Sequence, residues 1–200
     1  MKYRILLASL TMALAASLAA AQTPPSHVRG TIASSDGKTL TVTTREGPTA
    51  SIALPETAKI AAVKTMELSA IAPGTFIGTA AEPAADGSLK AVEVLVFPEA
   101  MRGAGEGHYA WDLAPGQSMT NANVDAAVQS NSGRDLTLSY KGGSVKVTVP
   151  PDVPVVTLIP ADRADLKPGA PVFVVALHNA DGSMSAAFVA VGKDGVKPPM

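Results

Sequence analysis

The chain has 200 residues, with 16 Lys and Arg against 17 Asp and Glu, and it contains no cysteine. The formal net charge of −1 argues against a nucleic-acid-binding protein, because that function needs a basic face. The lack of cysteine excludes disulfides, thiolate metal sites and a cysteine nucleophile. A hydrophobic fraction of 46% is ordinary for a folded domain and argues against wholesale disorder.

Residues 1–21 have the pattern of a secretory signal peptide. Lys2 and Arg4 form a positive start, an apolar run continues to Leu18, and three alanines follow. Because signal peptidase requires small side chains at such a site, we expect cleavage before Gln22 and delivery to the periplasm or the medium of a bacterium. An uncleaved membrane anchor is the alternative, although the run is short for a span. No later stretch approaches the roughly 18 apolar residues of a spanning helix, so we expect no membrane span in the mature chain.

The rest of the chain contains an internal repeat. Three short blocks recur in the same order at an offset of 95 or 96 residues. They are residues 37–42 with 133–138, residues 68–74 with 163–169, and residues 85–89 with 180–184. Because a shared order is hard to obtain by chance, we interpret the chain as two copies of one module, over residues 28–97 and 121–192.

Each copy has the pattern of β-structure. Apolar residues alternate with polar or small ones from Val28 to Ile32 and again from Leu40 to Thr44, with Asp36-Gly37 between them. Asp-Gly between alternating runs predicts a hairpin turn, since the turn requires a positive φ. The same dipeptide precedes the last strand of each copy, at residues 86–87 and 181–182. Several short strands and one brief helical turn in about 70 residues predict a small closed barrel of the OB type.

These patterns predict an all-β protein with two tandem small OB-like β-barrel repeats joined by a long ordered connector. The expected parts are the signal peptide (1–21), a flexible tail (22–27), the first barrel repeat (28–97), the connector (98–120), the second barrel repeat (121–192) and a C-terminal tail (193–200). A barrel of about 70 residues has a thin core, so we expect the two barrels to touch and to bury more apolar surface together.

Five blocks of the mature chain carry a resemblance to known sequences. They are residues 28–32 (VRGTI), 97–103 (FPEAMRG), 105–108 (GEGH), 119–122 (MTNA) and 191–196 (VGKDGV). With them the chain resembles an uncharacterised family of exported proteobacterial proteins that carry a β-barrel domain of unknown function. The resemblance implies a location and a fold but no activity. Members are often labelled metal ABC transporter permeases, which this sequence contradicts because a permease needs several spanning helices.

The connector, residues 98–120, concentrates the side chains that carry chemistry. It holds the only tryptophan, Trp111, beside Tyr109 and His108. Its charged residues are Glu99, Arg102, Glu106 and Asp112. A stretch of this length without periodicity is usually functional or disordered, and the aromatic residues favour docking over disorder. One interpretation is structural: the aromatic residues pin the connector into the seam between the barrels, and Arg102 pairs with a nearby acid.

A second interpretation is a divalent metal site in the connector. In an extended chain Glu106 and His108 point the same way, and Asp112 and Glu99 approach from either side. An imidazole with two or three carboxylates can hold Zn²⁺ or Mn²⁺. The alternative function is therefore a divalent-metal-binding accessory protein or a metal-assisted hydrolase, with Glu99 as a base. The signal is weak because the spacing matches no known metal motif.

We favour a non-enzymatic periplasmic binding or interaction module that uses the connector and the seam between the barrels and needs no cofactor. An envelope protein, a glycan or a small molecule is the expected partner, and nucleic acid is not, because no stripe of aromatic and basic residues is present. The candidate ligand-binding residues are Arg102, Glu106, His108, Tyr109, Trp111 and Asp112. A purely structural envelope protein is a third interpretation, and analogy of fold does not choose among them.

Overall fold

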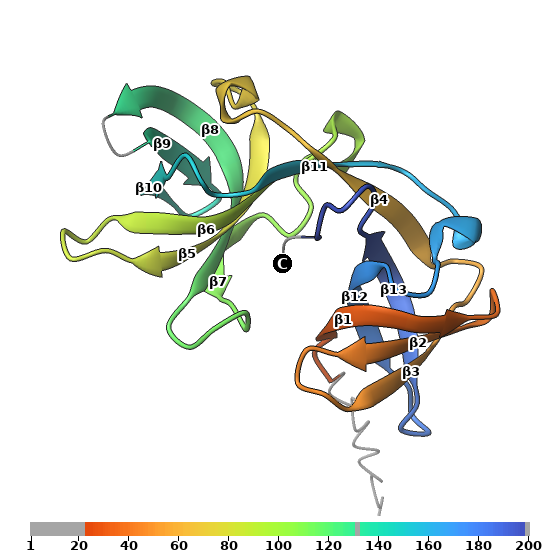
Figure 1. Ribbon diagram of the computed structural model, residues 1–200. Helices are drawn as coiled ribbons and strands as arrows, with labels where there is room; N and C mark the ends of the chain where they lie inside the picture. Colours follow the sequence, from red (N-terminus) through yellow and green to blue (C-terminus); the bar gives the residue numbers. More distant parts are fainter. Residues whose placement is uncertain (1–22, 131–132, 199–200) are drawn as a thin grey trace, which may run out of the picture.

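The computed structural model describes residues 23–130 and 133–198, and it is an all-β structure (Figure 1). Its strands in chain order are β1 (Ser26–Ser35), β2 (Thr39–Thr44), β3 (Thr49–Ala53), β4 (Lys59–Thr65), β5 (Phe76–Pro83), β6 (Leu89–Val96), β7 (Gly107–Ala110), β8 (Ser118–Ser130), β9 (Gly133–Tyr140), β10 (Gly143–Val149), β11 (Val155–Pro160), β12 (Pro171–His178) and β13 (Met184–Val191). Three 3₁₀ turns interrupt them, η1 (Leu68–Ala70), η2 (Glu99–Met101) and η3 (Arg163–Asp165). All the strands belong to one hydrogen-bonded sheet.

The sheet closes on itself twice, and the two closures form the two lobes of Figure 1. In ring one, β13, β12, β1, β2 and β3 follow one another, and a parallel pairing of β3 with β13 completes the circle. In ring two, β6, β5, β8, β9 and β10 do the same, completed by a parallel pairing of β10 with β6. The antiparallel strands β4 and β11 pair with each other and join the rings.

The repeat appears in the order of the elements. Each element of the first copy, from β1 to β6, has a counterpart about 95 residues later, from β8 to β13, and η1 corresponds to η3. Both 3₁₀ turns are followed by a residue that fills the core of a ring: Ile71 is 0% exposed and Leu166 is 3% exposed. Duplication of the sequence therefore produced a duplicated succession of structural elements.

The pairing between strands differs from the expected one barrel per copy over residues 28–97 and 121–192. Ring two is built from the continuous segment β5 to β10, which spans the end of one copy and the start of the other. Ring one combines β1, β2 and β3 with β12 and β13, from the two ends of the chain. Because both copies carry the same hydrophobic pattern, β5 fits β8 as well as it would fit β1. The pattern specifies the kind of partner and not the copy that supplies it.

Three apolar clusters hold this arrangement. One fills ring one and includes Leu40, Val42 and Val189; one fills ring two and includes Leu136 and Leu138. The third lies at the junction, where β4, β6, β11, β12 and β13 meet, and we call it the seam cluster. Its buried members are Val63, Leu95, Val156, Leu158, Phe173 and Ala190. The rings therefore share buried apolar surface, as expected for barrels with thin cores.

The three predicted Asp-Gly turns are confirmed and share one geometry. Their glycines, Gly37, Gly87 and Gly182, each have φ of +82°. In each turn the aspartate accepts a hydrogen bond from the backbone N–H two residues later, at 2.8 Å for Asp36 and 2.9 Å for Asp86 and Asp181. Such a side-chain bond stabilises the turn locally, which explains why this signal was readable from the sequence.

The ends of the chain differ in part from expectation. The flexible tail predicted for residues 22–27 is wrong at its end, because Ser26 and His27 belong to β1 and pair with β12. The predicted signal peptide, residues 1–21, lies outside the described residues. The described part of the C-terminal tail runs between the rings (Figure 1), and Val196 packs against the seam cluster. Across residues 23–130 and 133–198, no helix has the length and apolarity to cross a membrane.

Candidate functional site

The connector is an ordered part of ring two. It begins with η2 and continues as β7, which pairs antiparallel with β8 from Gly107↔Asn121 to Ala110↔Ser118. The backbone N–H of Trp111 then donates to the carbonyl of Gln117 at 2.9 Å, which closes the β7–β8 hairpin. The stretch that lacked periodicity in the sequence is therefore held by backbone hydrogen bonds.

Arg102 fastens the start of the connector. Its guanidinium donates to both carboxylate oxygens of Glu99, at 2.6 and 2.7 Å, to Asn123 Oδ1 at 2.6 Å and to the carbonyl of Gly74 at 2.9 Å. The hydrogen bonds from Arg102 lower the pKa of Glu99. Because the fork of Arg102 engages three separate segments, its place is structural.

Glu106 and His108 point to different neighbours. Glu106 Oε1 accepts the backbone N–H of Lys141 at 2.9 Å, in the turn between β9 and β10. His108 Nδ1 lies 2.8 Å from the hydroxyl of Thr120, and its ring stacks on Tyr140 with centroids 6.1 Å apart. Glu106 precedes β7, and the two side chains engage separate partners, although Lys141 and Tyr140 are adjacent in the chain.

Asn121 and Tyr109 hold the loop that precedes β7. The Asn121 side chain, 8% exposed, donates to the carbonyls of Ala104 and Gly105 and to the Tyr109 hydroxyl, each at 3.2 Å. Partial burial raises the pKa of the Tyr109 hydroxyl. The Tyr109 ring also meets Trp111 edge-on, with centroids 6.2 Å apart. Through these contacts, the loop before β7 and the Trp111 ring are both packed against Tyr109.

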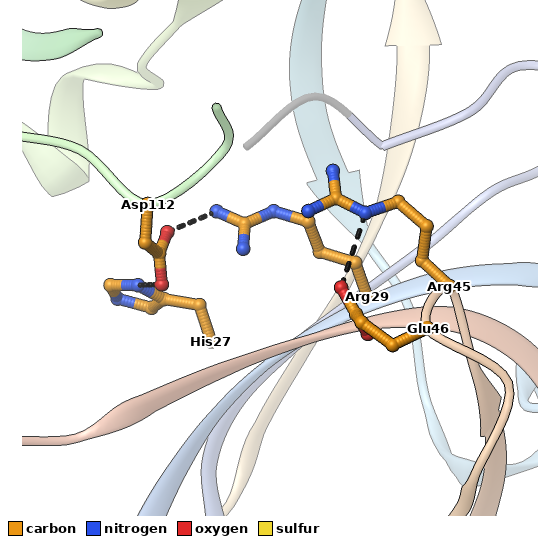
Figure 2. A network of polar contacts seen from close by, with 5 residues as sticks. All are labelled: His27, Arg29, Arg45, Glu46 and Asp112. Carbon is orange, nitrogen blue, oxygen red and sulfur yellow. Dashed lines mark hydrogen bonds and ion pairs between the residues drawn. The ribbon is translucent and has the colours of Figure 1, made fainter. Parts of the chain in front are cut away.

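Trp111 and Asp112 dock on the first strand of ring one. Asp112 Oδ1 accepts from Arg29 Nη2 at 2.7 Å, and Asp112 Oδ2 lies 2.9 Å from His27 Nδ1 (Figure 2). The Trp111 ring lies 4.4 Å from the His27 ring, centroid to centroid, and Arg29 sits 5.4 Å from the centre of the Trp111 ring. The guanidinium carbon of Arg29 also lies 5.3 Å from the centre of the Phe173 ring. We call His27, Arg29, Trp111 and Asp112 the clasp, because they connect the two rings.

The clasp changes the acidity of Asp112. Partial burial alone would raise the pKa of this carboxyl, but the hydrogen bonds from Arg29 and His27 outweigh burial and lower it. The carboxylate is therefore stabilised by the residues that it joins. His27 and Arg29 were missed in the sequence as site residues. Their signal was the alternation of β1, which places positions 27 and 29 on one face of the strand.

The predicted metal ligands are not brought together. Glu99 binds Arg102, Glu106 binds Lys141, His108 binds Thr120 and Asp112 binds Arg29 and His27. Among the described residues, no group of three or more His, Cys, Asp or Glu side chains is placed to hold a metal ion. The arrangement expected for Zn²⁺ or Mn²⁺ is thus not formed, because each carboxylate has a different partner.

A cavity of about 390 Å³ lies beside the clasp, and we call it the seam cavity. Its lining comes from β1, β2, β6, β12, the connector and the C-terminal tail: Arg29, Gly30, Thr31, Thr43, Thr44, Arg45, Glu93, Leu113, Pro171, Val172, Phe173, Lys197 and Pro198. A second cavity of about 550 Å³ shares Glu93, Lys197 and Pro198 with it and extends toward β4 and β11. The C-terminal tail therefore lines both cavities.

Of the predicted ligand-binding residues, none lines the seam cavity directly; the connector contributes Leu113 instead. Trp111 and Asp112 contact the cavity residue Arg29, whereas Arg102, Glu106 and His108 serve ring two. Comparison of the chain with protein-family models, with curated proteins and with solved structures finds no match.

Proposed function

We propose that this chain is an exported, non-enzymatic binding module whose ligand enters the seam cavity. The observation that carries the proposal is the origin of the lining: ring one, ring two, the connector and the tail each contribute residues to one hollow. Its volume of about 390 Å³ lies in the range of small-molecule sites. Binding sites occur preferentially where structural units meet, and the seam is such a place.

The chemistry of the lining favours recognition of a small molecule. Threonine hydroxyls at positions 31, 43 and 44 offer neutral hydrogen bonds, and Val172 and Phe173 offer an apolar wall. A mostly apolar hollow with a few placed polar groups is typical of ligand sites. Trp111 and Asp112 have a positioning role in this proposal, since they hold Arg29 at the wall of the cavity.

The finer structural and cellular assignments belong to the same proposal. Five strands closed into a circle support an OB-like barrel for each ring, and barrels of that type bind ligands on an open face. The pattern of residues 1–21 supports export to the periplasm or the medium. Both fit the resemblance to exported proteobacterial β-barrel proteins.

A matched pair of variants tests the proposal. Thr43 lines the seam cavity, and Thr41 lies on the same face of β2 without lining it. Small molecules from an envelope extract are equilibrated with residues 22–200 as wild type, Thr43→Phe or Thr41→Phe, and the retained compounds are identified by mass spectrometry. We expect a compound retained by wild type and by Thr41→Phe but lost from Thr43→Phe. Identical retention by all three proteins would contradict a binding site in the seam cavity.

A further inference from the structure

Resting on the proposed function, we propose that the ligand of the seam cavity carries an anionic group, a carboxylate or a phosphate, on an apolar body. Three cationic side chains line the cavity, Arg29, Arg45 and Lys197, and Glu93 is the acid among the lining residues. They come from β1, from the end of β2 and from the C-terminal tail. Cations from three segments around one hollow attract a negative charge into it.

Arg29 is the most firmly placed of the three. Its side chain is 11% exposed, and its guanidinium carbon lies 5.4 Å from the centre of the Trp111 ring and 5.3 Å from the centre of the Phe173 ring. The hydrogen bond to Asp112 at 2.7 Å fixes the orientation of the guanidinium (Figure 2). A guanidinium held in this way keeps its positive charge at the wall of the cavity, where the charge attracts an anionic group.

Arg45 can add charge without losing a strong partner. The ion pair of Arg45 with Glu46 is 3.3 Å long, and both side chains are about half exposed or more, at 46% and 64%. Such an exposed pair contributes little and is readily exchanged for a bound anion. The backbone N–H of Arg45 donates to the carbonyl of Arg29 at 2.8 Å, so the two arginines stem from adjacent points of the sheet.

The rest of the cavity wall is apolar, and it indicates what the uncharged part of the ligand should be. Leu113, Pro171, Val172 and Phe173 provide an apolar surface beside the cations. A free inorganic anion would leave this surface in contact with water, whereas an alkyl or aryl chain would cover it. The combination therefore fits an amphipathic small molecule with one acidic end.

Fluorescence of Trp111 measures this preference in the intact fold. Trp111 is the only tryptophan, and it lies against Arg29. Residues 22–200 are titrated with octanoate, octyl phosphate and octan-1-ol, three probes with the same chain. We expect a saturable change with one or both anions and a dissociation constant about tenfold lower than for octan-1-ol, because hydrogen bonds to charged groups are stronger than neutral ones. The two anions distinguish a carboxylate from a phosphate ligand.

Three variants make the result interpretable. The double variant Arg45→Gln with Lys197→Gln is expected to weaken anion binding about tenfold. The control, Lys38→Gln with Lys146→Gln, removes two exposed cations that do not line the seam cavity and should leave binding unchanged. Equal affinity for all three probes, abolished by Thr43→Phe, would overturn the anionic preference and leave the binding cavity intact. No saturable change with any probe, or a change that Thr43→Phe does not affect, would overturn both.

Discussion

Asp112 accepts a 2.7 Å hydrogen bond from Arg29, which lies 83 residues earlier in the chain. The pair joins the connector of ring two to the first strand of ring one, and its arginine lines the seam cavity. Because the same carboxylate also meets His27 at 2.9 Å, one side chain holds two residues of β1.

Neutralising Asp112 should loosen the contact between the rings. We expect Asp112→Asn to lower the free energy of unfolding by about 0.5–1 kcal/mol, since the carboxylate is half exposed and its contacts with Arg29 and His27 lose their negative partner. Urea unfolding monitored by Trp111 fluorescence measures this. Glu46→Gln, which removes an exposed partner of Arg45, is the matched control and should change stability less. An equal effect of both substitutions would argue that the clasp contributes nothing specific.

The contribution of the clasp to stability should also depend on pH. The pKa of Asp112 is lowered in the folded state, so the folded protein holds this proton less tightly than the unfolded chain does. Its stabilisation is therefore present above the unfolded pKa, near 3.8, and is lost as the pH falls through the folded value. The difference in unfolding free energy between wild type and Asp112→Asn should shrink progressively as the pH falls below about 5. A difference that stays constant over this range would contradict the lowered pKa.

Arg163 should stabilise ring one across the two copies. It stands in η3, and its guanidinium donates to the carbonyls of Gly37 at 2.8 Å, Leu54 at 3.1 Å and Pro55 at 2.8 Å. Its counterpart in the first copy is Leu68. We expect Arg163→Leu to destabilise the protein by about 1–3 kcal/mol, because three carbonyls lose a charged donor. Hydrogen exchange resolved by residue should show the loss in β1–β3 and not in β8–β10. Arg163→Lys keeps the charge without the fork and should recover only part of the stability.

The predicted export leads to a direct measurement at the N-terminus. When the full chain is expressed in a bacterium, the protein in the periplasmic fraction should begin at Gln22, as measured by intact mass. Ala21→Arg places a large charged side chain where signal peptidase requires a small one, so the precursor should accumulate uncleaved. A full-length wild-type chain that stays in the cytoplasm would refute the signal-peptide assignment.

Local features of the fold were predictable, and the pairing between distant strands was not. The Asp-Gly turns and the alternating strands depend on neighbouring residues, so the hairpin β1–β2 and the repeat could be read directly. Each strand could pair with a strand of its own copy or with the equivalent strand of the other copy. Because the two copies have the same hydrophobic pattern, the sequence does not show which pairing forms. For this reason the sequence did not predict that ring one combines strands from both ends of the chain.

The same limit applies to the candidate site. Trp111 and Asp112 stood out by residue type, but His27 and Arg29 lie in ring one, 85 and 83 residues before Asp112 in the chain. The flexible tail predicted for residues 22–27 includes His27, which the structure places in β1. The metal interpretation failed for a different reason, since spacing along a chain does not reveal that each acid has a nearer donor.

The most direct test of the central claim is a two-dimensional ¹H–¹⁵N spectrum of residues 22–200, titrated with octanoate. Binding in the seam cavity predicts concentration-dependent shifts of the backbone signals of Thr31, Thr43, Phe173 and Lys197. The signals of Glu106 and His108, which serve ring two, should stay in place. Shifts confined to the β7–β8 hairpin, or to the Asp-Gly turns, would contradict a ligand site at the seam between the rings.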